Sequence, residues 1–466
     1  MRGLALIAGL TAVLVLGAGL DTRSHARPAA VGPNALARAV TPGQLKAHLA
    51  ALEGIARRNG RTRAAGTRGY EQSVAYVAGQ LRAAGYRPRL QSFSFDLFRE
   101  TAPPRLERLE PGAREYRAGR DFLTMRYSGS GTVSAAVAPV QPASASSGCE
   151  PSQFADFPRG AVALLRRGTC FFFQKARNAA AAGAGAVLIA NDGRPGRTAP
   201  IAATLVRPGI GIPVLIVSSA VGDELARAAQ AGTARVSVAV SAVTRSARAA
   251  NVIADLPGRG RGVVLLGAHL DSVANGPGIN DNGSGSALVL EIARQARRLG
   301  VRQARGLRFA FWGAEELGLV GSRAYVAGLS ARERERLSAV LNFDMVGSPN
   351  FARFVYDGDT APAGSARIEN LFHSYFAARR QPVEELSLGG SSDHAPFAEA
   401  GVAVGGLFTG GDDLKPAGLA RRFGGTAGEP YDACFHKACD TMANVNVRVL
   451  GQMADAAAVV ALRLAG

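Results

Sequence analysis

The stretch from residue 263 to 285, VVLLGAHLDSVANGPGINDNGSG, begins as an unbroken apolar run and ends where a helical pattern starts. Further short apolar runs follow at 307–312, 340–343 and 402–408. Helical patterns lie between and after them, at 284–299, 324–337, 364–379 and 445–464. Continuous apolar strands that alternate with helices are typical of parallel sheets covered on both faces. The predicted fold class is therefore α/β, with a mostly parallel mixed sheet sandwiched by helices.

The chain that precedes this α/β region contains two segments with different residue patterns, the first helical and the second β-rich. Helical spacing of apolar residues runs from Thr41 to Ala84, with a second helix starting near Thr67. From Pro103, short apolar runs alternate with alanine, glycine and proline breaks, which is typical of a β-rich unit. We therefore divide the chain into a signal peptide at 1–26, N-terminal helices of the α/β domain at 40–102, an inserted domain at 103–246 and the rest of the α/β domain at 247–466.

Arginine accounts for nearly all of the positive charge. The 466 residues carry 54 lysines and arginines against 36 acidic residues, a formal net charge of +18 at pH 7. A charge of this size usually raises nucleic acid or an anionic membrane as a partner. Only four of these cations are lysine, and the arginine pairs are scattered without interleaved aromatic residues. We interpret the charge as a composition bias and expect no nucleic-acid partner.

The N-terminus has the layout of a secretory signal peptide. Arg2 is followed by an apolar run from Leu4 to Leu20 and then by a polar stretch that ends in small residues near Ala26. A membrane anchor is the alternative, but a run of 17 residues is at the lower limit for a span, and no basic cluster follows it. We therefore predict cleavage near Ala26 and a secreted protein with no stable membrane anchor.

The four cysteines form two pairs that are local in the sequence, Cys149 with Cys170 and Cys434 with Cys439. An even, paired count in an exported chain predicts two disulfides, because nothing outside the cell keeps thiols reduced. Zinc binding by cysteine is the alternative. The spacing of Cys434 and Cys439 is at the edge of what zinc ligands use, whereas the other pair is too widely spaced.

Acidic residues and histidines cluster where the predicted strands end. They are His269, Asp271, Asp281, Glu315, Glu316, Asp344 and, nearer the C-terminus, His436. Taken singly, each has an ordinary explanation as a helix cap, a surface charge or a structural histidine. The carboxyl ends of parallel strands share one crevice, however, so side chains that follow these strands gather there. Two histidines with several carboxylates are a suitable set for two zinc ions that share a ligand.

Six segments, in order, resemble the co-catalytic di-zinc aminopeptidases of the leucyl type that bacteria secrete. They are GAHLDS (267–272), GINDNGSG (278–285), WGAEELGLVGS (312–322), LNFDMVG (341–347), SSDHAPF (391–397) and YDACFHKACDT (431–441). Another stretch, from RGTC (167–170) to IAN (189–191), resembles the protease-associated (PA) domain that is commonly inserted in this family. The resemblance implies a zinc-exopeptidase-like catalytic domain interrupted by a β-rich PA domain.

The resemblance also implies roles for the matching residues. One zinc ion would be held by His269 and Asp344 and the other by Glu316 and His436, with Asp281 bridging both. Glu315 matches the general base, and Asp271 matches the carboxylate that orients His269. A water between two zinc ions loses its proton easily, and Glu315 would accept that proton and pass it to the leaving amine. The expected cofactor is two Zn²⁺ per chain, and the residues leave open whether calcium also binds.

Three residues are expected in the substrate pocket. By the resemblance, Met345 and Phe408 line it, although packing in the core explains them equally well. Their lining would favour large apolar N-terminal residues such as leucine. Phe435 stands where secreted relatives often carry a tyrosine whose hydroxyl stabilises the tetrahedral intermediate, and losing such a donor costs a factor on the order of 100 unless another group compensates. Ser391 likewise stands where some relatives carry an arginine.

Other functions stay open. A non-catalytic binding protein on a peptidase fold is one, although such proteins usually lack the metal ligands that are all present here. A zinc carboxypeptidase of the same family is another, and it would tolerate a blocked peptide N-terminus. A serine hydrolase is not indicated, because no Gly-x-Ser-x-Gly turn follows a strand. The expected partners are peptides with a free N-terminus, and we expect a monomer.

Overall fold

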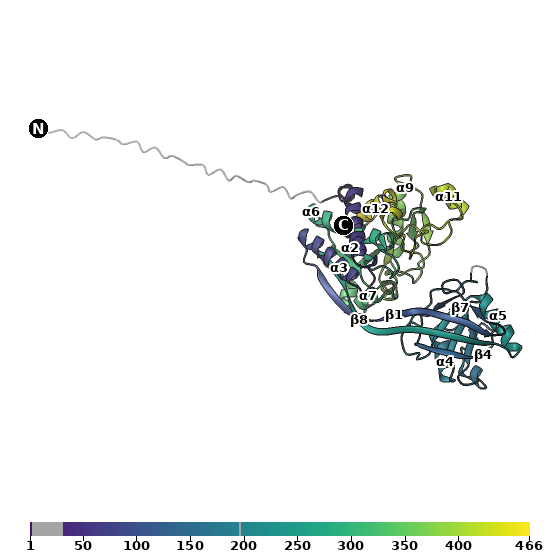
Figure 1. Ribbon diagram of the computed structural model, residues 1–466. Coiled ribbons are helices and arrows are strands. Elements are labelled where there is room, and N and C mark those ends of the chain that lie inside the picture. The colour runs from purple at the N-terminus through teal and green to yellow at the C-terminus, as the bar shows by residue number, and fades with distance from the viewer. Residues whose placement is uncertain (2–30, 195–196) are drawn as a thin grey trace.

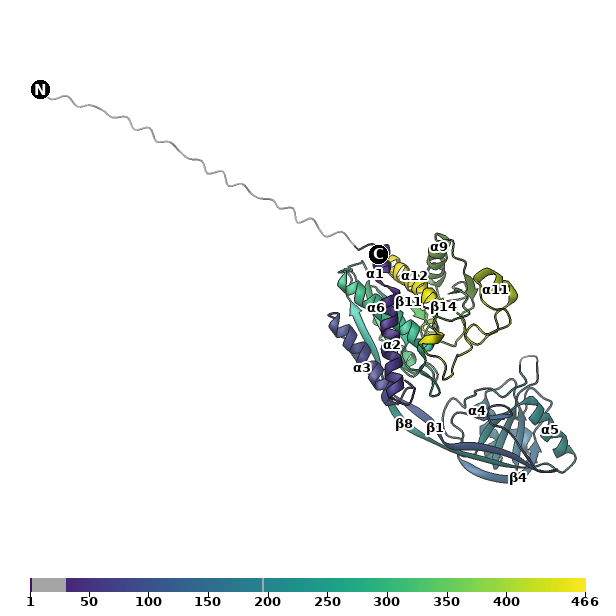
Figure 2. The ribbon, with the colours of Figure 1, turned by 45° about the horizontal axis from the view of Figure 1, so that its top comes forward.

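Two lobes, joined by a pair of long strands, make up the computed structural model (Figures 1 and 2). The structure describes residue 1 and residues 31–194 and 197–466. The predicted signal peptide therefore lies outside the described residues, apart from Met1. Within the described residues, no helix is both long and apolar enough to cross a membrane.

The two long strands are β1 (Arg89–Glu110) and β8 (Arg235–Leu256), which pair antiparallel over nearly their whole length. At one end of this ribbon, β8 pairs with a strand of the first lobe, and at the other end it pairs with a strand of the second. The chain thus leaves the first lobe along β1 and returns along β8, so the second lobe is an insertion. The predicted limits of that insertion, 103 and 246, fall inside the two strands and remain proposed limits.

The sheet of the first lobe is mostly parallel, as predicted. Its strands, in spatial order, are β13 (Glu384–Leu386), β12 (Phe354–Tyr356), β14 (Val404–Phe408), β11 (Leu337–Phe343), β9 (Val263–His269), β10 (Gly306–Trp312) and β8. The four central strands, β14, β11, β9 and β10, run parallel, whereas β8 and β12 are antiparallel to their neighbours in that group. The predicted α/β class with a mixed sheet is therefore confirmed.

Helices cover both faces of this sheet. Successive residues of a strand point to opposite faces, so apolar residues of one strand can pack against the helices on both sides. On β9, Val264 and Leu266 belong to one apolar core, and Leu265 belongs to another. The first core includes α1 (Pro33–Ala39), α2 (Pro42–Arg58), α3 (Arg68–Ala83), α6 (Gly285–Arg298), α9 (Ser365–Ala377) and α12 (Val447–Ala465). The second includes α7 (Val320–Ala327) and α10 (Ala395–Glu399). A further helix, α11 (Ala417–Phe423), lies toward the C-terminal part.

Helix boundaries follow local capping. Thr41 caps α2 at the start that the Thr-Pro sequence predicts. Its side chain accepts a hydrogen bond from the backbone N–H of Gln44, and the Gln44 side chain accepts one from the backbone N–H of Thr41. The single helix predicted over 324–337 is wrong. Ser330 caps a new helix, α8 (Ala331–Arg336), through a capping box with Glu333, so the chain turns between α7 and α8. A strong N-cap inside an amphipathic pattern thus divides it into two helices.

The inserted lobe has a small sheet with its own two cores. Its strands are β2 (Arg114–Glu115), β3 (Phe122–Thr124), β4 (Gly131–Pro139), β5 (Val162–Arg166), β6 (Ala186–Ala190) and β7 (Val214–Val217), flanked by α4 (Phe172–Ala181) and α5 (Ser219–Gln230). From β4 to β7 the strands are parallel. Both predicted disulfides, Cys149–Cys170 here and Cys434–Cys439 in the first lobe, are formed.

Candidate active site and metal centre

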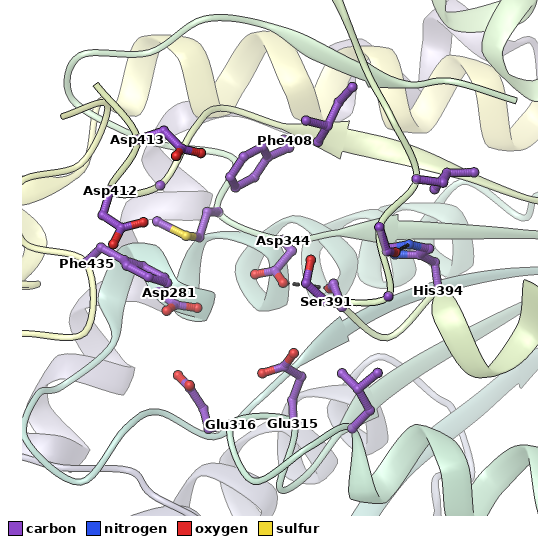
Figure 3. Close-up of a pocket in the computed structure, with 18 of the residues that line it drawn as sticks. Asp281, Glu315, Glu316, Asp344, Ser391, His394, Phe408, Asp412, Asp413 and Phe435 are labelled. Carbon is purple, nitrogen blue, oxygen red and sulfur yellow. Dashed lines mark hydrogen bonds between the residues drawn. The ribbon is translucent and has the colours of Figure 1, made fainter. Parts of the chain in front are cut away.

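The chemically active side chains lie where the central parallel strands end. His269 is the last residue of β9 and pairs in register with Trp312, the last residue of β10. Glu315 and Glu316 follow β10, and Asp344 follows β11 directly. Figure 3 shows the carboxylates of Asp281, Glu315, Glu316 and Asp344 around a common space. Parallel strands therefore bring together residues that are up to 75 positions apart in the sequence.

Asp281 lies between the two histidines. His269 Nε2 is 3.2 Å from Asp281 Oδ1 and 3.2 Å from Asp344 Oδ1. On the other side, His436 Nε2 is 3.1 Å from Asp281 Oδ2 and 3.0 Å from Glu316 Oε2. The five predicted ligands thus form two groups, His269–Asp281–Asp344 and Asp281–Glu316–His436, which share one carboxylate.

The chemistry of these groups fits a pair of divalent cations. Burial raises the pKa of Glu316 to about 7, and the charge of Asp281 adds to this shift. Among the described residues, Glu316 Oε1 is buried without a hydrogen-bond partner. Although burial opposes the shift, bonds to Asp281 and Glu316 raise the pKa of His436 to about 10. The clustered carboxylates therefore favour the binding of a cation here. Zinc binds to imidazole nitrogen and carboxylate oxygen, which are the donor atoms of both groups.

Asp271 contacts both a predicted ligand and the predicted base. Its Oδ1 accepts a hydrogen bond from the backbone N–H of Glu315 at 3.1 Å. The same oxygen is 3.7 Å from His269 Nδ1, whereas the backbone carbonyl of Asp271 is nearer, at 3.2 Å. The residue therefore contacts the ring of His269 mainly through its backbone and holds the Glu315 loop through its carboxylate.

Ser392, which the sequence did not single out, fixes Asp344. Its hydroxyl donates to Asp344 Oδ2 at 2.7 Å and accepts from the side-chain amide of Asn342 at 2.8 Å. Ser392 lies in the SSDHAPF segment, so its position was marked by the sequence but its role was not. These bonds orient the carboxylate that faces His269.

Two other residues that sequence reasoning missed hold the loop that carries Asp281. Asp440 accepts hydrogen bonds from the backbone N–H groups of Asn280, at 2.8 Å, and Asp281, at 3.0 Å. The buried guanidinium of Arg63 donates to the backbone carbonyls of residues 270, 277 and 278. Asp440 lies within the YDACFHKACDT motif, although its role was not recognised, whereas Arg63 stands between two helices with no pattern that marks it.

A cavity of about 520 Å³ opens beside this centre. All three predicted pocket residues, Met345, Phe408 and Phe435, line it. The ring of Phe435 stacks on that of His436, with the two centroids 3.8 Å apart. Met345 and His436 have φ angles of 49° and 57°, in the left-handed region that residues other than glycine rarely adopt. Such conformations gather at functional sites, where the surrounding structure holds them in place.

Residues 251–461 match Peptidase family M28, and residues 133–225 match the PA domain. The aminopeptidase of Pseudomonas aeruginosa is 43% identical over 443 residues, covering 92% of this chain and 82% of that protein. The chain belongs to peptidase family M28. The match to the PA domain lies within the predicted insertion, and the resemblance inferred from the sequence is confirmed.

Solved structures agree with this M28 assignment. The aminopeptidase from Aneurinibacillus sp. strain AM-1 superposes with a TM-score of 0.77 at 25% identity, covering 93% of this chain and 96% of that one. The structure of BSAP, a zinc aminopeptidase from Bacillus subtilis, gives a TM-score of 0.64 at 25% identity, covering 90% and 94%. This M28 chain therefore shares most of its length with proteins of known structure.

Proposed function

We propose that this M28 protein is a secreted, two-zinc aminopeptidase that removes the N-terminal residue of peptides. One observation carries the proposal: the two oxygens of Asp281 face two different histidines, and each histidine has a second carboxylate beside it. Glu315 has a carboxylate that can act as a general base, and its Oε2 lies 3.9 Å from His269 Nε2. The names of the related proteins support peptide hydrolysis from the N-terminus, and one of them supports zinc.

Zinc held by the two ligand groups that share Asp281 would lower the pKa of a bound water and would polarise the scissile carbonyl. Glu315 accepts a proton from the attacking water at its carboxylate and delivers it to the nitrogen of the leaving amine. Burial raises the pKa of Glu315 above its usual value, which makes its carboxylate a stronger base. Carboxylates around Asp281 attract the positively charged α-amine of the substrate.

The cavity supports a preference for large apolar N-terminal residues. Met345 is buried, and Phe408 and Phe435 present aromatic rings to the same space. A leucine side chain placed there would lose its contact with water, which favours binding by roughly 2 kcal/mol over a bare glycine. Rates across aminoacyl p-nitroanilides, with leucine and glycine as the two ends of the series, measure this preference directly.

Secretion rests on separate features. The chain begins with an Arg-led apolar run, and two disulfides join its four cysteines. Disulfides persist in oxidising compartments outside the cytosol. We propose a secreted monomer that acts on peptides with a free N-terminus and binds neither nucleic acid nor a membrane, and light scattering on the mature protein would test the monomer.

Removing zinc is expected to abolish hydrolysis of leucine p-nitroanilide, and adding zinc back is expected to restore it. Both groups of ligands consist of histidine nitrogen and carboxylate oxygen, and neither offers a substitute for the cation. The measurement is the rate after dialysis against a chelator, with the zinc content of the same sample. Full activity in protein that contains no zinc would contradict the proposal.

A peptide with an acetylated N-terminus separates the proposal from a carboxypeptidase of the same family. We expect a free-amine peptide to lose its N-terminal residue and the acetylated peptide to stay intact. Release of the C-terminal residue from the acetylated peptide would indicate the carboxypeptidase instead. Purified protein that binds no zinc and cleaves neither peptide would indicate a non-catalytic binding protein.

Phe435→Tyr is expected to raise kcat on leucine p-nitroanilide by about 10- to 100-fold. The ring would keep its stacking on His436 while its hydroxyl gains access to the cavity, where it can donate to the developing oxyanion. Phe408→Tyr is the matched control, since it adds the same hydroxyl to another wall of the cavity. Equal rates in wild type and Phe435→Tyr would mean that another group already supplies this bond.

A further inference from the structure

The inserted lobe contributes one side chain to the cavity beside the metal centre. Among the described residues that line this cavity, Arg126 is the one that lies between 103 and 246. It follows β3 in the inserted lobe, and every other described lining residue comes from the M28 lobe. The cavity is therefore built by both lobes, with a cation on the side of the insertion.

The backbone that carries Arg126 is firmly held. Its N–H donates to the carbonyl of Ala203 at 2.9 Å, and its carbonyl accepts from the N–H of Leu205 at 3.0 Å. The next residue, Tyr127, donates its hydroxyl to the carbonyl of Asp96 on β1 at 2.9 Å. A side chain on a backbone fixed from both sides and tied to the connecting ribbon is well placed for precise recognition.

The guanidinium of Arg126 has no acceptor within the described part of the chain. No hydrogen bond or ion pair joins it to another described residue, and its Nη1 atom is buried without a partner. Burial lowers the pKa of Arg126, and the carboxylates of Glu316 and Glu315 are among the groups that oppose this shift. The cation thus lies within electrostatic range of the catalytic carboxylates without pairing with them. A half-buried guanidinium whose N–H groups have no acceptor among the described residues can donate hydrogen bonds to an anionic ligand.

The substrate can supply that anion. If the proposed aminopeptidase function holds, the α-amine and the scissile bond lie at the metal centre, and the N-terminal side chain lies near Met345 and Phe408. The remainder of the peptide must then extend through the rest of the cavity, whose wall includes Arg126. A guanidinium binds a carboxylate with two parallel hydrogen bonds, which gives both affinity and direction.

We propose that Arg126 is a specificity-determining residue that binds a carboxylate on the leaving part of the substrate. The inserted PA domain would then act in substrate selection, favouring short peptides with a free C-terminal carboxylate or peptides with an acidic residue just beyond the scissile bond. The inference rests on the proposed function, but it concerns which peptides bind and not how the bond is cleaved.

The experiment compares kcat/KM for peptide acids and the corresponding amides, Leu-Gly, Leu-Gly-Gly and Leu-Gly-Gly-Gly. In the wild type, we expect the acid to be preferred about tenfold at the length that reaches Arg126, as one charge-assisted hydrogen-bonded contact provides. The ratio of kcat/KM for the acid to kcat/KM for the amide should fall to about one in Arg126→Gln and below one in Arg126→Glu. Arg117→Gln, which removes an exposed arginine of the same lobe, is the matched control and should keep the wild-type ratio.

A second pair of substrates, Leu-Glu-Gly-amide and Leu-Gln-Gly-amide, tests a side-chain carboxylate as the source of the anion. Preference for the glutamate peptide that disappears in Arg126→Gln assigns the site to acidic residues, and preference in the first series alone assigns it to the C-terminus. Ratios that are the same in wild type and Arg126→Gln in both series would overturn the proposal.

Binding of a product peptide separates this inference from the proposed function. Calorimetry is expected to show Gly-Gly binding to the wild type about tenfold more tightly than Gly-Gly-amide, with the difference lost in Arg126→Gln. This readout needs no turnover. If the wild type cleaves nothing yet discriminates the two ligands through Arg126, the aminopeptidase proposal fails and the carboxylate site stands. If it cleaves leucine p-nitroanilide but shows no discrimination, the reverse holds.

Discussion

Glu315→Gln is expected to lower kcat on leucine p-nitroanilide by about 1,000-fold while the zinc content stays at the wild-type level. Glutamine keeps the size of the side chain but cannot accept the proton of the attacking water. The backbone N–H of Glu315 would still donate to Asp271, so the loop after β10 would keep its place. The two ligand groups that share Asp281 do not include Glu315, so their donor atoms are unchanged. Steady-state kinetics and metal analysis on the same preparation measure the two effects.

Glu316→Gln is the control for this prediction, because it makes the same chemical change at the next residue. Glu316 Oε2 lies 3.0 Å from His436 Nε2 within one of the ligand groups. We expect this variant to lose both zinc and activity, whereas Glu315→Gln loses activity alone. Loss of zinc in both variants would remove Glu315 from the role of base and make it a ligand, and an unimpaired rate in Glu315→Gln would leave it with neither role.

The M28 lobe could be predicted from the sequence because most of its chemically active residues closely follow an apolar run. His269 ends β9, and Asp344 follows β11, so the positions of the strands also gave the positions of the ligands. The carboxyl ends of parallel strands meet at the same edge of the sheet, so residues that are far apart in the sequence lie close together there. His436 and Asp281 are the exceptions, since both lie well away from the strand ends, and they were found through their motifs.

The ribbon of β1 and β8 could not be predicted as one feature. Most of its residues are exposed or only partly buried, and each strand serves two lobes, so no single apolar periodicity runs through it. Pro103 and Pro104 fall near register shifts in the pairing, which made the end of a domain a reasonable prediction there. Pairing between strands more than 100 residues apart depends on the whole fold and leaves little local trace.

Residues that act through backbone groups could not be given a role from the sequence either. Arg63 and Asp440 hold the Asp281 loop by bonding to its carbonyls and N–H groups, which every sequence possesses. A pattern of side chains identifies a site by its donor atoms, whereas the residues that shape the loop around it can have any spacing. Their discovery therefore required the structure, and their importance can be measured.

Arg63→Met is expected to lower the free energy of unfolding by about 3–5 kcal/mol and to weaken zinc binding. Arg63 is fully buried and donates to three backbone carbonyls, those of Leu270, Pro277 and Gly278. Methionine fills a similar volume but leaves these acceptors unsatisfied and removes a cation that lies near Asp271 and Asp281. Denaturant unfolding with and without bound zinc measures both effects.

Two further variants show whether the loss arises from the loop. Arg63→Lys keeps a positive charge but replaces the planar fork with a single ammonium, so it is expected to recover part of the stability and little of the zinc affinity. Arg57→Met removes an exposed arginine of α2 and should change the free energy of unfolding by less than about 0.5 kcal/mol. If Arg63 acts by holding the Asp281 loop, Arg63→Met should lose more stability in the zinc-loaded protein than in the zinc-free protein, because only the loaded form depends on the placement of Asp281. Equal losses in the two forms would mean that Arg63 supports the core alone, and the position of the shared ligand would then rest on Asp440.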